Sequence, residues 1–213
     1  MKVYFISGLA ADRKIFSKIE LPEHCSAVYL DWIPVLKGES LTQYSLRLAQ
    51  KIDTKEEFSI IGLSFGGVVA TEINKLYKPF KLILISSVPD KNYIPLVYRM
   101  LGRLESEKAL FPWMLNRLRP ILKWFFGPLS LDTENLVDEY LNNADFRLLK
   151  WSLGQIGRWK NDKLPENFIQ IHGSDDRIFP ASFSSVNYIV KGGHLCVYDN
   201  SNQVNAVLRN VLG

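Results

Sequence analysis

The sequence of 213 residues is poor in cysteine, in histidine and in long apolar runs. Its two cysteines, Cys25 and Cys196, cannot build the framework of several disulfides that holds small secreted domains together, although one bridge between them stays open. No segment approaches the roughly 18 apolar residues that a membrane-spanning helix needs. The chain starts MKVYFISGLAAD, and its run VYFI is too short for a signal peptide. We therefore expect a cytoplasmic protein with no stable membrane insertion.

Only three histidines occur, at His24, His172 and His194, and none stands at His-x-x-His spacing. The cysteines do not form Cys-x-x-Cys either, so the spacings that are typical of zinc sites are missing. The sequence also lacks the G-x-G-x-x-G and Walker patterns that hold nucleotide phosphates. We therefore expect no metal and no cofactor.

Positive charge is in slight excess, with a net charge of +4. Residues 91–165 contain 12 Lys and Arg against 8 Asp and Glu, which accounts for the whole excess. No nucleic-acid-binding motif accompanies this small surplus, so we expect no nucleic acid partner. The surplus indicates solvated helix faces, and a mild preference for anionic substrates is the alternative interpretation.

Short apolar runs alternate with helical patterns at both ends of the chain. Most of these runs are nearly continuous in apolar residues, as is typical of parallel strands that are buried on both faces. The alternation predicts an α/β fold with an open, doubly wound, mostly parallel sheet. The predicted strands are 2–6, 26–30, 58–62, 81–85, 168–171 and 188–190, and helices are predicted from Ser40 through Ile52, over 65–77 and over 203–212.

This regularity breaks between Pro89 and Pro165, where no strand signal appears and four of the five tryptophans lie. Some 75 residues of helical pattern are too many for a simple crossover between two strands. We predict one domain whose core comprises residues 1–89 and 166–213, with residues 90–165 inserted as a helical cap over the carboxyl edge of the sheet. Cap helices are predicted at 96–104, 109–126, 133–142 and 146–159, the second of them kinked or broken near Pro120.

The strongest local signal is the segment Gly62-Leu63-Ser64-Phe65-Gly66-Gly67, which fits G-x-S-x-G between a predicted strand and a predicted helix. A nucleophile in a sharp turn needs neighbours without side chains, because Cβ atoms there would collide with the backbone. Its position at the start of a helix places amide donors and the helix dipole near developing negative charge. The pattern predicts Ser64 as a catalytic nucleophile.

A serine nucleophile needs a base and a third group that orients the base. His194 follows Gly192 and Gly193 just after the last predicted strand, where the third member falls in the chain order Ser, acid, His. We predict His194 as the general base, and we interpret His24 and His172 as structural. The acid is expected after the preceding strand, where Asp175 and Asp176 are adjacent candidates.

The GLSFGG turn, the HGSDDRIFP segment, the GGH loop and the opening SGLAAD together resemble the α/β-hydrolase superfamily, in particular its small, lid-bearing, single-domain serine hydrolases. In that family the acid lies three residues after the glycine of G-x-x-D-x-x-x-P. The resemblance therefore implies Asp176 over Asp175, with Asp90 as a distant third. It also implies a sheet of about six parallel strands that lacks the family's antiparallel edge.

The resemblance further implies an oxyanion hole made of two backbone amides. One amide belongs to the residue after the nucleophile, here Phe65, and the other to the loop after the first strand, here Leu9. Relatives read His-Gly-x in that loop, whereas this chain reads Ser7-Gly8-Leu9. The departure at Ser7 concerns the geometry of the loop more than the chemistry.

The stretch Ala109–Leu129 interleaves aromatic and aliphatic residues with Arg117, Arg119 and Lys123. The simplest interpretation is an amphipathic cap helix that packs on the sheet. Two alternatives are an acyl or aromatic substrate pocket and reversible binding to a membrane surface. The pocket would be lined by Phe111, Trp113, Met114, Trp124 and Phe125.

These features predict a hydrolase that cleaves a carboxylic ester or thioester of a small-molecule acyl substrate through an acyl-Ser64 intermediate. A lyase or an acyltransferase of the same fold is the alternative, because fold and triad do not fix the acyl acceptor. A non-catalytic ligand-binding protein is the alternative from another class, although it has no need of a complete set of Ser64, Asp176 and His194. No feature of the sequence predicts the oligomeric state.

Overall fold

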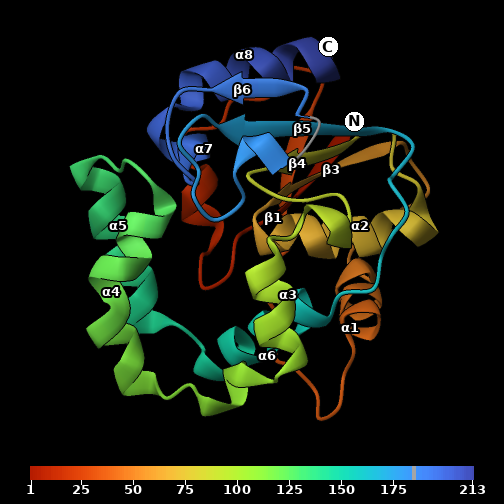
Figure 1. The fold of residues 1–213 in the computed structure, drawn as a ribbon. Helices are drawn as coiled ribbons and strands as arrows, with labels where there is room; N and C mark the ends of the chain where they lie inside the picture. Colours follow the sequence, from red (N-terminus) through yellow and green to blue (C-terminus); the bar gives the residue numbers. More distant parts are fainter. Residues whose placement is uncertain (184–185) are drawn as a thin grey trace.

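A computed structural model describes residues 1–183 and 186–213, and Figure 1 shows its fold. Six strands form one sheet with the order β2-β1-β3-β4-β5-β6. All five neighbouring pairs are parallel, which confirms the predicted doubly wound sheet. The strands are β1 (Lys2–Ile6), β2 (Ser26–Tyr29), β3 (Phe58–Leu63), β4 (Leu82–Ile85), β5 (Phe168–Gly173) and β6 (Tyr188–Val190).

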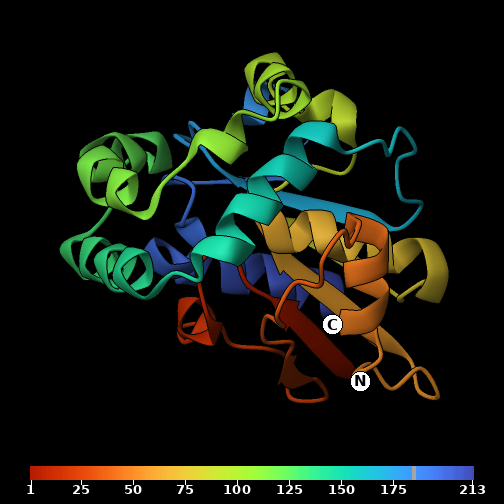
Figure 2. The same cartoon turned by 90° about the horizontal axis from the view of Figure 1, so that it is seen from below.

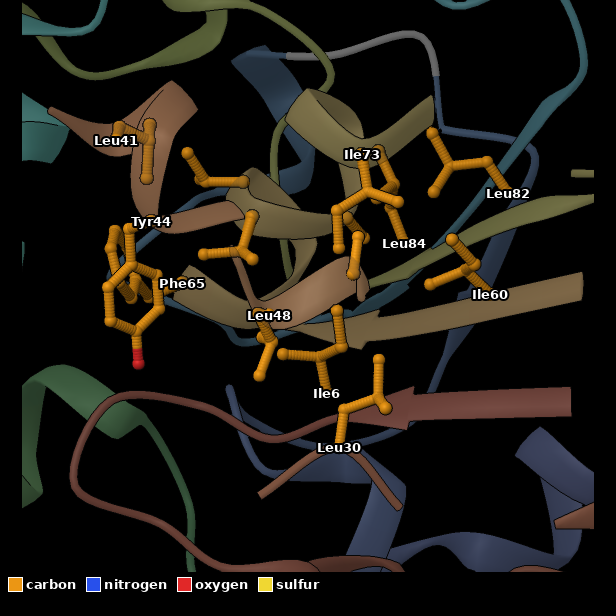
Figure 3. Close-up of a cluster of buried hydrophobic side chains, with 14 of the residues drawn as sticks. Ile6, Leu30, Leu41, Tyr44, Leu48, Ile60, Phe65, Ile73, Leu82 and Leu84 are labelled. Carbon is orange, nitrogen blue, oxygen red and sulfur yellow. The ribbon is translucent and has the colours of Figure 1, made fainter. Parts of the chain in front are cut away.

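Alternate residues of the central strands enter two separate cores, one on each face of the sheet. Tyr4 and Ile6 of β1 pack with the helices α1 and α2, in the cluster drawn in Figure 3. Val3 and Phe5 of the same strand pack with α7 and α8 on the opposite face. Burial on both faces accounts for the nearly continuous apolar runs. The helices that cover the sheet are α1 (Leu41–Ala49), α2 (Phe65–Tyr77), α7 (Cys196–Asp199) and α8 (Ser201–Leu212), with the short η1 (Arg13–Phe16) before β2.

Helix α1 begins at a reciprocal cap. The Ser40 hydroxyl accepts the amide of Gln43, and the Gln43 side chain accepts the amide of Ser40. This capping box satisfies two donors that the first turn leaves unpaired. The helix ends at Ala49, earlier than its apolar pattern through Ile52 predicted. Ile52 is nevertheless buried beside the helix, which accounts for the longer pattern.

The connection between β4 and β5 contains helices and, among the described residues, no strand. Helices α3 and α6 pack against each other, and α4 and α5 form a second pair that Figure 1 shows standing apart from them. A Cβ atom on Gly102 would lie 2.3 Å from the Cα of Gly157, so the two glycines permit the close approach of α3 and α6. The elements are η2 (Lys91–Tyr93), α3 (Leu96–Arg103), η3 (Ser106–Ala109), α4 (Pro112–Phe126), α5 (Leu131–Asn143) and α6 (Phe146–Arg158), followed after β5 by η4 (Ala181–Phe183).

Helix α4 runs through Pro120 as one continuous helix, so a break there is wrong, whereas a kink stays a prediction. Proline removes one backbone donor from a helix interior. Because Pro120 is exposed, water can satisfy the carbonyl that loses this donor.

Two tryptophans attach α6 and the residue after it to the core. The indole of Trp151 donates to the carbonyl of Glu39 at 2.8 Å, and the indole of Trp159 donates to the buried carboxylate of Glu72 at 2.7 Å. Figure 2 shows α6, in cyan, beside the gold and orange helices α2 and α1. These bonds hold the α3–α6 pair on the face of the molecule that α1 and α2 form.

Both cysteines are free, which closes the alternative of a bridge between Cys25 and Cys196. In the described parts of the chain, none of the helices combines the length and the apolar character that crossing a membrane requires.

Candidate active site

Ser64 occupies the turn from β3 into α2 with a φ of 53° and a ψ of −122°. This conformation is sparsely populated for a residue with a side chain and costs about 1–3 kcal/mol. Three hydrogen bonds hold the turn. The Ser64 amide donates to the carbonyl of Ile85 (3.0 Å), and the Ser64 carbonyl accepts from the amide of Gly67 (2.9 Å) and the hydroxyl of Ser87 (2.6 Å). The half-buried Ser64 side chain is thus fixed at the carboxyl end of β3.

The glycines around Ser64 stand where other backbone comes close. A Cβ atom on Gly66 would lie 2.3 Å from the carbonyl oxygens of Ile6 and Ser7. One on Gly62 would lie 2.4 Å from the Cα of Gly67. Such distances exclude side chains at both positions, which is the reason the sequence pattern requires glycine there.

The imidazole of His194 lies between Ser64 and Asp176. Its Nε2 atom is 2.8 Å from Oγ of Ser64, and its Nδ1 atom is 2.8 Å from Oδ2 of Asp176. A neutral imidazole with its proton on Nδ1 donates to Asp176 and accepts the hydroxyl proton of Ser64. His194 and Asp176 are buried. The three residues, which come from the turn after β3 and the loops after β5 and β6, form one hydrogen-bonded series.

The carboxylate of Asp176 is fixed by its own loop. Its Oδ1 atom accepts the amides of Ile178 (2.9 Å) and Phe179 (3.0 Å), so Oδ2 is left to face His194. These two amides fix the orientation of the carboxylate. Asp176 is therefore held in the orientation that faces His194.

The two other acid candidates have different partners. Asp175 is exposed and accepts the hydroxyl of Ser174 at 2.6 Å. Asp90 is buried and accepts the amide of Asn92 at 2.6 Å as the N-cap of η2. The hydrogen-bonded series from Ser64 through His194 therefore ends at Asp176, and neither Asp175 nor Asp90 belongs to it.

The predicted oxyanion donors belong to Phe65, which follows Ser64, and to Leu9, which follows Gly8. The Phe65 amide begins α2, where the first amides have no partner within the helix. Gly8 lies against Ser64, since a Cβ atom on it would be 3.4 Å from Cβ of Ser64, and Leu9 follows it. Within residues 1–183 and 186–213, neither the Leu9 amide nor the Phe65 amide has a hydrogen-bond partner. Ser7 stands where the resembled family has histidine. Its hydroxyl donates to the carbonyl of Ala11 at 2.7 Å and so stabilises the same loop.

Two phenylalanines beside His194 were not predicted. The ring of Phe126, at the end of α4, stacks on the imidazole at 5.7 Å, and its carbonyl accepts the His194 amide at 2.6 Å. The ring of Phe179 lies 6.0 Å from the imidazole. The contacts join segments far apart in the chain, so no local pattern could have identified them. They restrict the position of the imidazole.

His172 is fully buried within β5, in agreement with its interpretation as a structural residue. Its Nδ1 atom lies 3.1 Å from the carbonyl of Phe179 and its Nε2 atom lies 2.9 Å from the carbonyl of Ser87. Burial lowers the pKa of His172 below its ordinary value. The charge of Asp176, 3.9 Å away, acts in the other direction and raises this pKa, but its effect is smaller. His172 thus supports the loop that carries Asp176.

The predicted pocket residues lie along α4 and its start. Trp124 packs against Arg177 at 4.5 Å and, with Lys123, lines a surface hollow of about 380 Å³. The described lining of this hollow includes none of Ser64, Asp176 and His194. Exposed fractions are 55% for Phe111, 62% for Trp113 and 58% for Trp124, whereas Met114 and Phe125 are half-buried. Of the predicted set, this hollow includes Trp124 alone, and the role of the set as a substrate pocket stays a prediction.

No protein-family model and no curated protein matches the sequence. Solved structures match over nearly the whole chain. A thermophilic esterase from Thermogutta terrifontis has a TM-score of 0.77 at 16% identity, covering 100% of this chain and 89% of that chain. A bromoperoxidase from Bacillus anthracis has 0.74 at 16%, covering 99% and 91%. MenH from S. aureus has 0.70 at 15%, covering 100% and 93%. At these identities the likeness concerns the fold alone.

Proposed function

The chain has the α/β-hydrolase fold, and we propose that it hydrolyses a carboxylic ester or thioester of a small molecule through an acyl-Ser64 intermediate. The observation that carries this proposal is the hydrogen-bonded series from Ser64 through His194 to Asp176, with both distances at 2.8 Å. A hydroxyl beside an imidazole that a carboxylate orients is an activated nucleophile.

In the acylation step, Oγ of Ser64 attacks the acyl carbon while Nε2 of His194 takes up the hydroxyl proton. Negative charge then develops on the former carbonyl oxygen, and the amides of Leu9 and Phe65 stabilise it. The tetrahedral intermediate collapses, the bond to the leaving oxygen or sulfur breaks, and His194 returns the proton to the leaving group. Asp176 holds the Nδ1 proton throughout and stabilises the imidazolium.

In the second half, a water molecule gives its proton to Nε2 of His194 and attacks the acyl carbon of the ester on Ser64. The same two amides receive the negative charge of the second tetrahedral intermediate. Its collapse releases the carboxylic acid, and the proton returns from His194 to Oγ of Ser64. The reaction needs no cofactor, because the side chains supply every proton transfer.

Residues 90–165 serve as a cap in this proposal. Support comes from the contact of Phe126 with His194 and from Tyr98 of α3, whose ring lies 6.4 Å from that of Phe179. Helix α4 thus contacts the imidazole directly, and helix α3 contacts Phe179, which lies beside the imidazole. A substrate that approaches Ser64 passes beside these helices.

The proposal is tested with a fluorophosphonate probe and a panel of p-nitrophenyl esters and acyl thioesters. Wild-type protein is expected to gain the probe's mass on the peptide that contains Ser64 and to turn over some of the panel. Ser64→Ala is expected to lose both properties. Equal labelling of wild type and Ser64→Ala would contradict the assignment. Labelling without turnover of any ester or thioester would instead favour transfer to another acceptor or a lyase reaction.

A further inference from the structure

We propose that Trp32, which follows β2, is a positioning residue that sets the direction of both oxyanion amides. This inference rests on the proposed function. It concerns the loop Gly8–Ala11, which carries one of the amides, and Phe65, which carries the other. Trp32 is half-buried and takes no part in the hydrogen-bonded series of Ser64.

The loop Gly8–Ala11 is a tight turn in which the Ala11 amide donates to the Gly8 carbonyl at 3.1 Å. Ala10 has a φ of 63°, in the left-handed region that favours glycine. An alanine in this conformation is held by its surroundings and not by its own preference. The turn therefore depends on contacts from outside it.

The indole of Trp32 supplies such contacts at both ends of the turn. Its N–H points at the Gly8 carbonyl (3.2 Å) and the Ala11 carbonyl (3.1 Å), in a bond shared between two acceptors. The Ser7 hydroxyl donates to the same Ala11 carbonyl at 2.7 Å. Two side chains thus hold the turn from one side.

The bond to Gly8 has a direct consequence for Leu9. The carbonyl of Gly8 and the N–H of Leu9 belong to one planar trans peptide unit, so they point in opposite directions. An indole that fixes the Gly8 carbonyl on one side fixes the Leu9 N–H on the other. Since Gly8 lies against Ser64, the direction of this N–H decides whether it reaches the oxyanion.

The ring of Trp32 acts on the second donor. It stacks on the ring of Phe65 with centroids 5.7 Å apart and planes at 25°. Phe65 is buried and is the residue whose amide begins α2. One side chain therefore contacts the peptide unit that carries the Leu9 N–H, through its own N–H, and the ring of Phe65, through its ring face.

The chain offers a matched control in Trp151. Its ring also contacts Phe65, at 6.1 Å, and Tyr44, at 4.8 Å, and it is half-buried like Trp32. Its indole N–H, however, donates to the carbonyl of Glu39 and not to the Gly8–Ala11 loop. Replacing each tryptophan by phenylalanine removes one indole donor from the same aromatic cluster, and only Trp32→Phe releases the turn.

We expect Trp32→Phe to lower kcat on a p-nitrophenyl ester by roughly 10–100-fold, because the loss of a whole oxyanion donor costs about 100–1000-fold and misdirection costs less. KM is expected to change less than about twofold, since the donors act on charge that develops in the transition state. Butylboronic acid, which forms a tetrahedral adduct on the serine, is expected to bind more weakly by a similar factor. Ser7→Ala, which removes the other donor to Ala11, is expected to show a smaller loss of the same kind.

The matched variant Trp151→Phe is expected to keep kcat and boronate affinity within about threefold at a comparable loss of thermal stability. Full kcat in folded Trp32→Phe, or equal losses in both tryptophan variants, would overturn the role of Trp32. If Trp32→Phe does not fold, an unchanged kcat and boronate affinity in Ser7→Ala overturns it. Wild-type protein that neither reacts with a fluorophosphonate nor turns over any ester would overturn the proposed function itself, and this inference with it.

Discussion

Asp176 and His194 meet through a 2.8 Å contact between Oδ2 and Nδ1, while Asp175, one residue earlier, is turned to the surface and bonded to Ser174. Two amides of the following turn hold the other oxygen of Asp176, so the loop itself decides which of the two neighbouring carboxylates faces the imidazole. Asp175 and Asp176 therefore allow the effect of replacing a buried aspartate to be compared with that of replacing an exposed one.

We expect Asp176→Asn to lower the acylation rate by roughly 1,000–10,000-fold, because an amide in place of the carboxylate favours the wrong imidazole tautomer and does not stabilise the imidazolium. Asp175→Asn is the matched control and is expected to stay within about threefold of wild type. Stopped-flow labelling with a fluorophosphonate measures both rates. A larger loss in Asp175→Asn than in Asp176→Asn would show that the acid is assigned to the wrong residue.

The sequence was informative where backbone geometry restricts the residue type. Gly62 and Gly66 stand where a Cβ atom would come within 2.4 Å and 2.3 Å of other backbone, and this requirement makes the turn around Ser64 visible as a pattern. The continuous apolar strands were equally visible, because both faces of the sheet are covered. The choice between Asp175 and Asp176 was not visible in the residues themselves and depended on the resemblance to a family.

Contacts between distant segments left no such pattern. Phe126 meets His194 only because α4 ends beside the loop after β6, and the indole of Trp32 meets the Gly8–Ala11 turn across neighbouring strands. Several of the aromatic residues that make the helical segment conspicuous in the sequence, such as Trp113, are largely exposed. Composition indicated that the helical segment is rich in aromatic side chains but not which of them reach the site.

Buried His172 predicts a loss of stability in mild acid. Burial lowers its pKa in the folded protein, so in the unfolded chain, where the ordinary value is about 6.5, it binds a proton at a higher pH than in the folded state. The stabilising effect of the neutral imidazole is complete above that unfolded value. It is lost as the pH falls from about 6.5 towards the folded pKa, at up to about 1.4 kcal/mol per pH unit.

Urea unfolding at pH 7.5, 6.5 and 5.5 measures this dependence, in a range where carboxylates stay ionised. His172→Gln is the control, since glutamine does not titrate and the other two histidines remain in place. We expect the variant to be less stable at pH 7.5 and to lose less of its free energy of unfolding as the pH falls. Parallel pH dependences in the two proteins would exclude His172 as the source.

The two free thiols are expected to react very differently. Burial raises the pKa of Cys196 to about 12, so almost no thiolate forms at pH 8, and the side chain is inaccessible. Cys25 is half-buried, and burial raises its pKa as well. Titration with a chromogenic disulfide reagent should therefore count at most one slow thiol in native protein and two in guanidinium. Cys25→Ser should leave native protein unreactive, and a fast thiol in that variant would contradict the burial of Cys196.

The last prediction concerns the acyl group and the aromatic residues of α4. The end of this helix contacts His194 through Phe126, and the ring of Trp124, two residues earlier, packs on Arg177, the residue after Asp176. Trp113 is equally exposed but stands 11 residues before Trp124, about 17 Å away along the helix. If Trp124 covers the acyl chain of the substrate, its removal should alter selectivity for chain length, whereas removal of Trp113 should not.

Burial of one methylene contributes about 0.8 kcal/mol when it is complete, so partial burial against a helix predicts a several-fold rise of kcat/KM for every two carbons added to a p-nitrophenyl ester. We expect this rise in wild type from acetate towards octanoate and in Trp113→Ala, and a flatter profile in Trp124→Ala, with turnover of the acetate ester retained in all three. A flat profile in wild type would show that the α4 aromatics do not contact the acyl group. Equal profiles in the two tryptophan variants would place acyl recognition on another element, because only Trp124 stands in the last turn of α4 with Phe126.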